Sequence, residues 1–376
     1  MLNFLTSTPF ALRHSEVNGK FSTAYQNRNS PSPILMGEGK GEGISKQEDR
    51  MWRIFLGLLS LAFLSSIVSG VHAAPIRIAS AGLSGEFLPL WVAQDRRLFK
   101  KYGLDTEVIT IQGGPLAVQT LLSGSVQFHA GGTSSIIDAK MRGADTATLA
   151  VFIDSLPYTL IASQAIKSAT QLKGKKFAVS RLGSVSDLSL RIALRNMGIN
   201  PEKEAVILGI GDQTARFTAL RSGSVDATVI SPPLTVTARK MGFTQITSFQ
   251  DAGITWTYNS IDTTADFAQR NPQTVLNFLR GFVEGIAYIF KNKEESLVTL
   301  KQWMRLDDRE ALDETYDYLL RILPKKPYAS DKGFQAVLDA LAIRDPIAKK
   351  YKPQDFIEAR YLKELDQSGF LDRVFK

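Results

Sequence analysis

The sequence predicts an α/β protein of two similar lobes, each containing a parallel-rich sheet. Three observations support this prediction. The phrase Leu-x-Ser-Gly-Ser-Val occurs at 121–126 and again at 220–225, which indicates an internal repeat. Strand-like and helix-like segments alternate around each copy, as they do in parallel α/β sheets. Two extended segments, 148–163 and 246–261, can connect the two halves.

The first half begins with a short alternating strand and continues with helices that have clear start and stop signals. Gly103 ends the first helix, and Pro115 suits the first turn of the second. The elements expected are strands at 75–80, 105–111 and 126–131 and helices at 87–102, 115–122 and 133–141.

The second half repeats this order at an offset of 95 to 100 residues. Gly198 ends a helix as Gly103 does, and Asp212 is expected to cap the next one. The repeated phrase is then the end of a helix, a glycine stop and the entry to a strand, where glycine adopts a left-handed conformation at little cost. The elements expected are strands at 175–180, 204–211 and 224–231 and helices at 187–197, 213–221 and from 232 onward.

The two extended segments form the predicted hinge, and a helical tail follows it. The segments 75–155 and 251–376 are expected to form lobe one, and 156–250 lobe two. Asn271 is a plausible N-cap and Pro272 a first-turn proline for the first tail helix. The tail helices expected to pack on lobe one lie at 272–290, 293–305, 308–322, 332–343 and 354–367.

The N-terminal region has a different character. Residues 1–50 are rich in Ser, Pro, Gly and charge, so we expect disorder or upstream sequence included by a wrong start assignment. Residues 51–74 are typical of a signal peptide, with Arg53 before an apolar core at 54–68 and a cleavage site at 71–73. The run is shorter than the roughly 20 residues of a membrane span, although an uncleaved anchor is the alternative.

Composition excludes several kinds of chemistry. The 376 residues include no cysteine, which removes disulfides, thiol nucleophiles and thiolate metal sites. His129 is the one histidine after the signal segment, so we expect no multi-histidine metal site and no cofactor, and we interpret His129 as structural. The net charge of +8 reflects either a solvated basic surface or a preference for anions. Basic residues are dispersed, which argues against nucleic-acid binding.

The carboxyl ends of the predicted strands indicate where a ligand would bind. Helices start at each of these ends, and their N–H groups favour anions. Arg181 is the expected cation for an acidic ligand, although it could be solvated or pair with Asp187. Trp256 and Tyr258 could stack on a ligand or belong to the hinge core. The strand-end segments are 81–87, 131–135, 181–187 and 231–234, and their serine and threonine side chains could equally be helix caps.

Three phrases in the sequence resemble one known family. "SGEFLPLWVAQDRRLFKKYGLD", "GKKFAVSRLGSVSD" and "LRSGSVDATVISPPL" occur in the order found in the NMT1/THI5-like substrate-binding proteins of the nitrate, sulfonate and taurine class of ABC transporters. The resemblance covers about 76–290. It implies a two-lobe periplasmic-binding-protein fold of type II. The pocket positions that it implies are Ser84, Gly85, Phe87, Thr133, Ser134, Arg181, Gly183, Ser184, Asp187, Ser231 and Pro232.

The predicted function is that of a periplasmic solute-binding component of an ABC importer. No catalytic motif is present, so we expect a monomer that closes about a small anionic or heterocyclic solute and delivers it to an inner-membrane ABC permease. The alternatives are an enzyme of pyrimidine or other small-molecule metabolism and a ligand-sensing or scaffold protein. Family members that synthesise a pyrimidine need histidine and cysteine residues, which disfavours the enzyme.

The start assignment can be tested directly. If translation begins at Met51, mass spectrometry of the precursor will find no peptide from 2–13. Detection of such a peptide would contradict the prediction.

Overall fold

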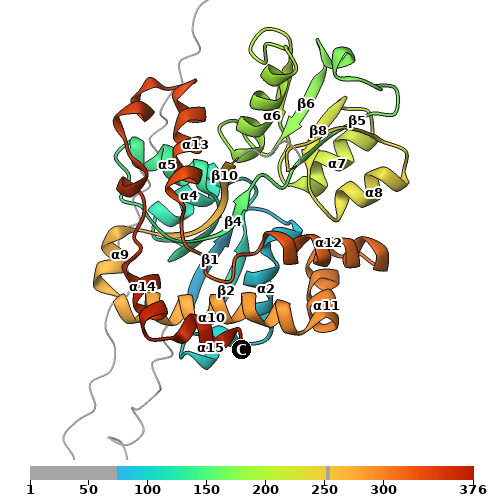
Figure 1. The fold of residues 1–376 in the computed structure, drawn as a ribbon. Coiled ribbons are helices and arrows are strands. Elements are labelled where there is room, and N and C mark those ends of the chain that lie inside the picture. Colours follow the sequence, from blue (N-terminus) through green and yellow to red (C-terminus); the bar gives the residue numbers. More distant parts are fainter. Residues whose placement is uncertain (1–73, 251–254) are drawn as a thin grey trace, which may run out of the picture. The chain divides into compact units, whose positions relative to one another are not determined.

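The computed structural model describes residues 74–250 and 255–376 (Figure 1). The predicted extension at 1–50 and nearly all of the signal segment lie outside the described residues. Within the described residues the chain forms two five-stranded mixed sheets, with the orders β2-β1-β3-β10-β4 and β7-β6-β8-β5-β9. In this part of the chain, no helix is both long and apolar enough to cross a membrane.

In each sheet four strands run in one direction and one strand runs in the opposite direction. β1 pairs in parallel with β2 and β3, and β6 pairs in parallel with β7 and β8. β10 and β5 run antiparallel to their neighbours. The first sheet consists of β1 (Ile76–Ser80), β2 (Thr106–Thr110), β3 (Phe128–Gly132), β4 (Ala147–Ser155) and β10 (Thr255–Thr263). The second consists of β5 (Thr159–Ala162), β6 (Lys176–Val179), β7 (Val206–Gly209), β8 (Ala227–Ile230) and β9 (Thr244–Ser248).

Helices connect the parallel strands, largely as predicted. The single helix expected at 87–102 is wrong, because Arg97 adopts a left-handed φ of 54° and divides it. Asp212 caps α7 as predicted, since its carboxylate accepts a hydrogen bond from the Ala215 N–H at 2.9 Å. The helices are η1 (Gly85–Phe87), α2 (Leu88–Asp95), α3 (Leu98–Lys101), α4 (Gly114–Leu122), α5 (Thr133–Met141), η2 (Ala169–Leu172), α6 (Val185–Asn196), α7 (Gln213–Arg221) and α8 (Leu234–Lys240).

The two copies of the repeated phrase have the same local structure. Gly124 and Gly223 both have a φ of +74°, the left-handed conformation predicted for them. The serine hydroxyl groups on either side of each glycine lie 2.9 Å apart in both copies. The phrase therefore ends α4 and α7 in the same way and starts the third parallel strand of each sheet.

The chain passes between the two sheets twice. β4 belongs to the first sheet and β5, which starts after three intervening residues, to the second. On the return, β9 belongs to the second sheet and β10 to the first. The Tyr258 hydroxyl donates a hydrogen bond of 2.7 Å to the Tyr158 hydroxyl, which links β10 to the segment before β5.

The C-terminal helices pack mainly against the first sheet and its helices. α10 carries the largest apolar face, and its Phe278 ring stacks on Phe128 and on Phe99. Asn271 does not cap α10 as predicted, because its amide donates to the Phe267 carbonyl instead. These helices are α9 (Ala265–Arg270), α10 (Pro272–Lys291), α11 (Lys293–Met304), α12 (Arg309–Ile322), α13 (Asp331–Ala342), η3 (Pro346–Lys350), η4 (Pro353–Asp355), α14 (Arg360–Gln367) and α15 (Phe370–Val374).

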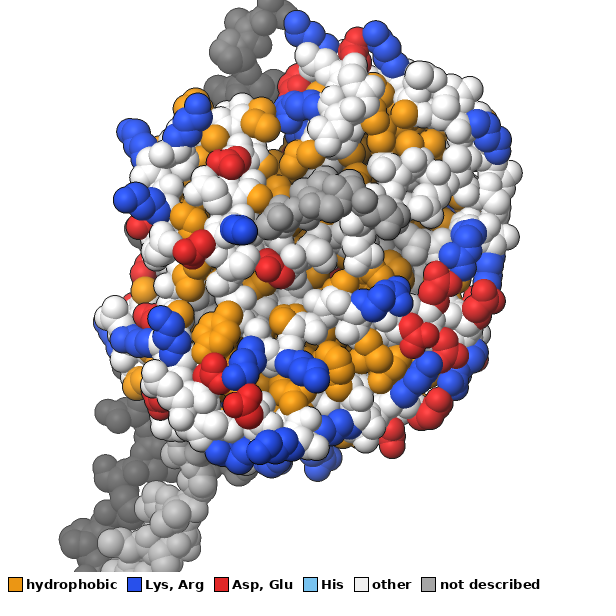
Figure 2. All heavy atoms as spheres, in the orientation of Figure 1, with side chains coloured by type: hydrophobic (Ala, Val, Ile, Leu, Met, Phe, Trp, Pro, Cys, Tyr) orange, Lys and Arg blue, Asp and Glu red, His pale blue; other side chains and the backbone are white. Residues whose placement is uncertain are grey.

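Charged side chains on α11 and α12 are interspersed by sign. Figure 2 shows acidic and basic groups side by side over these helices. Arg309 pairs with Glu294 at 2.7 Å and with Asp313 at 2.6 Å. This surface is a solvated network of ion pairs and not a basic patch, which fits the dispersed charge of the sequence.

His129 lies in the middle of the first sheet. It is fully buried, and its Nδ1 atom lies 2.9 Å from a carboxylate oxygen of Asp262 on β10. Thr148 and Ser260 donate to the same carboxylate. Asp262 therefore joins β3, β4 and β10 through side-chain hydrogen bonds, in addition to the backbone ladder.

The close approach of α10 to α2 depends on a glycine. A Cβ atom added at Gly285 would lie 2.6 Å from the Pro89 carbonyl oxygen and 3.0 Å from the Ala93 Cβ. Gly285→Ala should force the helices apart and lower the free energy of unfolding by about 1–3 kcal/mol, measured by urea denaturation. Gln273→Ala on the exposed face of α10 is the control and should change it by no more than about 0.5 kcal/mol. Equal stabilities of the two variants would contradict this packing.

Candidate functional site

A cavity lies between the two sheets. Its volume is about 50 Å³, and it is lined from the first lobe by Ser84, Phe87 and Gly132 and from the second by Ser184 and Arg216. Most of the lining residues follow the carboxyl ends of β1, β3 and β6, or precede α7, which is where parallel α/β sheets place ligands.

Four helices begin at this cavity. Gly114 at the start of α4, Ser135 in the first turn of α5, Val185 of α6 and Gln213 of α7 all line it. Each of these helices has at least nine residues. Because the first N–H groups of a helix have no partner within it, the cavity wall carries a partial positive charge from both lobes.

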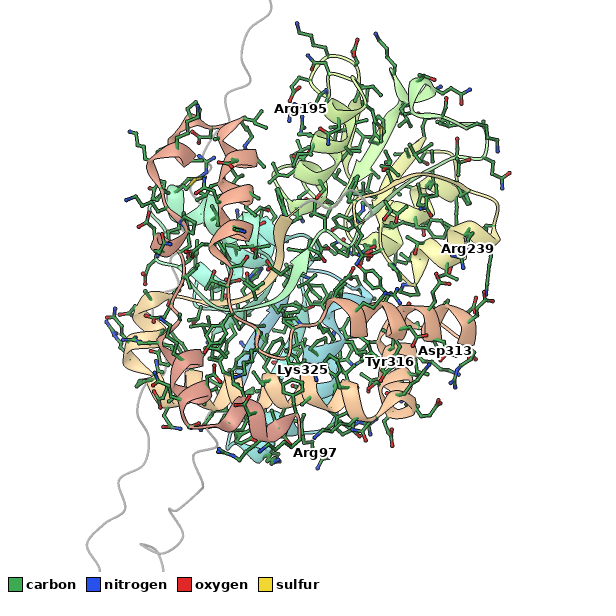
Figure 3. All side chains as sticks on the ribbon, in the orientation of Figure 1. Arg97, Arg195, Arg239, Asp313, Tyr316 and Lys325 are labelled. Carbon is green, nitrogen blue, oxygen red and sulfur yellow. The ribbon has the colours of Figure 1, made fainter. Side chains whose placement is uncertain are left out.

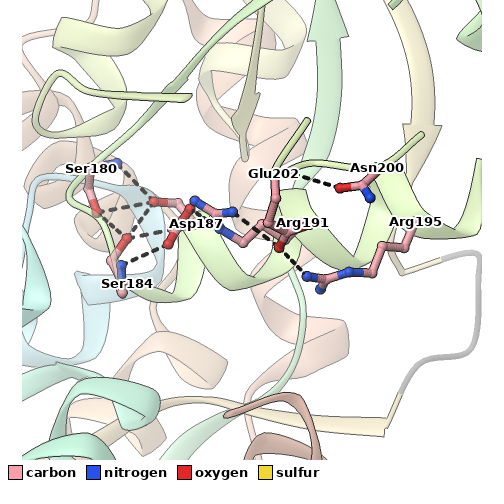
Figure 4. Close-up of polar contacts among 9 residues, drawn as sticks. Ser180, Ser184, Asp187, Arg191, Arg195, Asn200 and Glu202 are labelled. Carbon is pink, nitrogen blue, oxygen red and sulfur yellow. Dashed lines mark hydrogen bonds and ion pairs between the residues drawn. The ribbon is translucent and has the colours of Figure 1, made fainter. Parts of the chain in front are cut away.

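The start of α6 shows how its side chains are held (Figure 4). Ser184 is the N-cap, and its hydroxyl accepts a hydrogen bond from Ser180 at 2.8 Å. Asp187 accepts from the Gly183 N–H and pairs with Arg191, both at 2.8 Å. Asp187 thus supports the loop, and its carboxylate does not line the cavity.

Arg216 supplies the charge of the cavity. It lies on α7 with 1% of its surface exposed. Its two terminal nitrogens donate to the carbonyl oxygens of Gly211 and Val229 at 3.0 and 2.9 Å. Among the described residues, no carboxylate lies within ion-pairing distance of it, and its Nε atom has no hydrogen-bond partner. A buried guanidinium without a counterion is suited to receive an anion.

Two further polar groups of the cavity wall also lack partners in the described part of the chain. They are the Ser135 hydroxyl and the amide nitrogen of Asn259. Together with Arg216 Nε they give three hydrogen-bond donors around one small volume. Buried donors without acceptors are costly, so these groups are arranged for a ligand or water rich in acceptors.

Aromatic side chains form the rest of the wall. Phe87, Tyr158 and Tyr258 line the cavity, and the two tyrosine rings pack edge to face at 5.2 Å. Burial raises the pKa of both tyrosines, that of Tyr258 well above its ordinary value. Both hydroxyl groups are therefore neutral at physiological pH, and the rings can cover a flat or apolar part of a solute.

Of the positions expected from the sequence, the structure places three on the cavity wall. These are Ser84, Phe87 and Ser184. Thr133, Ser134 and Ser231 are buried but do not line it. Thr133 donates to the Tyr258 carbonyl, and the Ser231 N–H donates to the Gln213 side chain, so Thr133 and Ser231 support residues of the wall.

Other expected positions lie where the lobes meet. A Cβ atom at Gly85 would lie 3.1 Å from the Pro232 carbonyl oxygen, so these two residues pack across the cleft. Gly183 has a φ of +82°, and a Cβ there would lie 2.9 Å from a terminal nitrogen of Arg344. Arg181 is exposed, and its Nε donates to the Gln112 carbonyl at 2.8 Å. Arg181 is thus in a contact between the lobes and does not line the cavity.

Trp256 and Tyr258, the two aromatic residues of β10, have different surroundings. Trp256 is 2% exposed, belongs to the apolar core and does not line the cavity, whereas Tyr258 does. The sequence had left both roles open for both residues. Strand alternation does not separate them, because residues 256 and 258 are two positions apart and β10 has register shifts in this stretch. Their position along β10 does, since Tyr258 lies next to Asn259 at the cavity.

Sequence reasoning missed Arg216 and Asn259. A signal for Arg216 was present, since Gln213, Arg216, Phe217 and Leu220 follow helical spacing and all four are buried. An arginine on the apolar face of a helix is unusual and indicates a special environment. Asn259 gave no comparable signal.

Further contacts join the lobes outside the cavity. Arg239 of α8 pairs with Glu314 of α12 at 2.8 Å, and Lys240 pairs with Asp308 at 2.8 Å. Figure 3 shows Arg239 on α8 near α12. These ion pairs are partly exposed, so each contributes little to the free energy of closure.

A second, larger hollow lies between α7 and the end of α11. Its volume is about 980 Å³, and Thr214, Trp303 and Arg305 are among its lining residues. It is broad and solvated, whereas the Ser135 hydroxyl, the Asn259 amide nitrogen and the Arg216 Nε atom, which lack partners in the described residues, belong to residues that line the smaller cavity. The described residues contain no group of three metal-ligating side chains.

The fold and the cleft define a class of protein. Two mixed α/β lobes, joined by two crossings and followed by C-terminal helices, form a type II periplasmic-binding-protein fold. A family model described as NMT1/THI5 like matches residues 84–296, more than half of the chain. The chain belongs to this family, as the phrases in its sequence predicted.

Known proteins resemble the chain in sequence and in fold. A putative binding protein of Brucella abortus is 27% identical over 267 residues, which are 68% of this chain and 79% of that protein. A solved structure from Bordetella bronchiseptica has a TM-score of 0.71 and 23% identity, covering 79% of this chain and 98% of the other. The alkanesulfonate-binding protein SsuA from Xanthomonas axonopodis, bound to MOPS, has a TM-score of 0.61 and 19% identity, covering 76% and 96%.

Gly132 allows the lobes to approach each other. A Cβ atom there would lie 2.6 Å from a methyl group of Val185 on α6. Gly132→Ala should hold the lobes apart and increase the radius of gyration measured by small-angle X-ray scattering, without unfolding the protein. Adding Val185→Ala removes the methyl group and should restore the wild-type value. The prediction fails if the single and double variants scatter alike.

Proposed function

We propose that this protein is the solute-binding component of an ABC importer and captures a small anion in the cavity between its lobes. The observation that carries the proposal is the buried guanidinium of Arg216, which has no carboxylate partner in the described residues and lies where four helices begin. Its charge and the helix N-termini would together stabilise a carboxylate, sulfonate or phosphate.

The mechanism is closure of two lobes about the solute. The chain divides into 75–155 with 251–376 and 156–250, and the two crossings serve as the hinge. Donors on both sides would contact the solute only when the lobes are together, so the bound solute favours the closed form. With about 50 Å³ in this arrangement, a large solute requires the lobes to stand further apart.

The chemistry of the wall indicates the class of solute. Donors and a cation recognise an anionic end, and Phe87, Tyr158 and Tyr258 can cover a flat or apolar remainder. Organic sulfonates and small anionic heterocycles combine these two features. The fold of the alkanesulfonate-binding protein from Xanthomonas supports the same class.

The proposed cellular location follows from the predicted signal segment at 51–74. We infer that the protein is exported to the periplasm, acts as a monomer and delivers its solute to an inner-membrane ABC permease. The relatives described as putative binding proteins support binding over catalysis.

Arg216→Gln should weaken anion binding by about 2 kcal/mol or more, roughly 30-fold in Kd, because the solute loses its charged partner. Isothermal titration with nitrate, taurine, ethanesulfonate and an anionic pyrimidine would measure this. Arg216→Lys keeps the charge and should retain part of the affinity.

The matched control is Arg221→Gln, which removes an exposed arginine from the same helix. It should bind as tightly as the wild type. Failure of every solute in the panel to bind, or equal affinities for Arg216→Gln and Arg221→Gln, would overturn the proposed function.

A further inference from the structure

Glu86 is a buried carboxyl group that the proposed site does not use. It lies in η1 on the first lobe, with 1% of its surface exposed. Neither carboxyl oxygen has a hydrogen-bond partner of normal geometry within residues 74–250 and 255–376, although the hydroxyl groups of Ser84 and Ser231 lie nearby. An ionised carboxylate in such a position would lose its hydration and gain little in return.

The burial of Glu86 depends on the second lobe. Its neighbours Ser231 and Arg216 belong to the end of β8 and to α7. Gly85, the preceding residue, packs against the Pro232 carbonyl. When the lobes separate, these groups move away from η1 and water reaches the carboxyl group.

The charge of Glu86 also affects Arg216. The two side chains interact electrostatically but form no ion pair within 4.0 Å. An ionised Glu86 would partly neutralise the positive potential that Arg216 offers to an anion, whereas a neutral Glu86 would leave it intact. Protonation of Glu86 therefore removes a buried charge and strengthens the cationic character of the cleft.

We propose that closure of the cleft is coupled to protonation of Glu86, which is neutral when the lobes are together and ionised when they are apart. Closure then takes up a proton. The further consequence, that an anion is captured together with that proton, rests on the proposed function.

The direction of the effect follows from the pKa of Glu86. Burial is the largest cause and raises this pKa above its ordinary value of 4.5, while Ser231, Ser84 and Arg216 lower it by smaller amounts. The closed form thus holds the proton more tightly than the open form. Lowering the pH from neutrality towards 4.5 favours closure, and raising it through the closed-state pKa favours opening.

The tyrosines around Glu86 do not titrate in this range. Tyr158, Tyr258 and Tyr318 face Glu86 from three different segments, and burial raises their pKa values. The guanidinium of Arg216 faces Glu86 from α7. Two carboxylates in ion pairs between the lobes, Glu314 and Asp308, have pKa values lowered by Arg239 and Lys240. They remain ionised above pH 4.5, and comparison with a Glu86→Gln variant isolates the part of any pH effect that comes from Glu86.

The absence of cysteine from the sequence allows a direct measurement of closure. Spin labels would be attached at Lys203→Cys in the second lobe and Lys363→Cys on α14, both exposed positions. Double electron–electron resonance then gives the ratio of closed to open molecules from pH 8 to pH 5, without any solute. In the wild type this ratio should rise as the pH falls, by up to about tenfold per pH unit.

Glu86→Gln mimics the protonated side chain and should give a high ratio that does not change with pH. Glu364→Gln, which removes an exposed carboxylate on α14, should follow the wild type. A ratio in the wild type that is constant from pH 8 to pH 5, or a Glu86→Gln variant with the wild-type slope, would overturn the coupling.

This outcome is separable from that of the proposed function. If no anion in the titration panel binds but closure depends on pH through Glu86, the proton coupling stands and the proposed function fails. If anions bind through Arg216 while closure is independent of pH, the proposed function stands and the coupling is overturned.

Discussion

Each of the two sheets contains one strand that the chain enters directly after leaving the other sheet. β5 follows β4 of the first sheet and pairs in the second, and β10 follows β9 of the second and pairs in the first. Both pairings are antiparallel, and together they direct the carboxyl ends of the parallel strands of both lobes towards one cavity. The position of the cleft is therefore set by the backbone hydrogen bonds of these strand pairs.

The cleft is asymmetric although its scaffold is duplicated. At the offset of 99 that separates Leu121 from Leu220, the counterpart of Arg216 on α7 is Ala117 on α4. Both are buried and both helices begin at the cavity, but one helix contributes a guanidinium and the other a methyl group. The two lobes thus share a backbone that favours anions, and one lobe adds the formal charge.

The electrostatic interactions in the cleft depend on the exclusion of water when the lobes close. Arg216 is bonded to backbone carbonyl oxygens that fix its orientation without neutralising it. Glu86 approaches it from the other lobe, and burial raises the pKa of this carboxyl group. Removing water strengthens the positive potential of Arg216 and raises the pKa of Glu86 further, since charges interact more strongly, and are less well solvated, where the local dielectric constant is low. The proposed anion binding and the proposed proton coupling would therefore both act through Arg216 and Glu86 when the lobes close.

The sequence by itself determined the features that depend only on residues close to one another along the chain. It predicted the strand and helix order of both halves, the glycine turns at Gly124 and Gly223, the Asp212 cap and the strand-end loops, because glycine stops, caps and hydrophobic periods are local properties. It also predicted the family. The left-handed turn at Arg97 was missed, because a non-glycine residue in that conformation has no clear sequence signal.

Only the tertiary structure decided which residues meet in the cleft. Arg181 and Arg216 are the same residue type, and each follows a strand of the second sheet, yet one is exposed between the lobes and the other buried at the cavity. The antiparallel placement of β5 and β10 was likewise not predicted. The reason is that burial and strand pairing arise from contacts between segments about 100 residues apart, whereas a sequence pattern reports only on the few residues around each position.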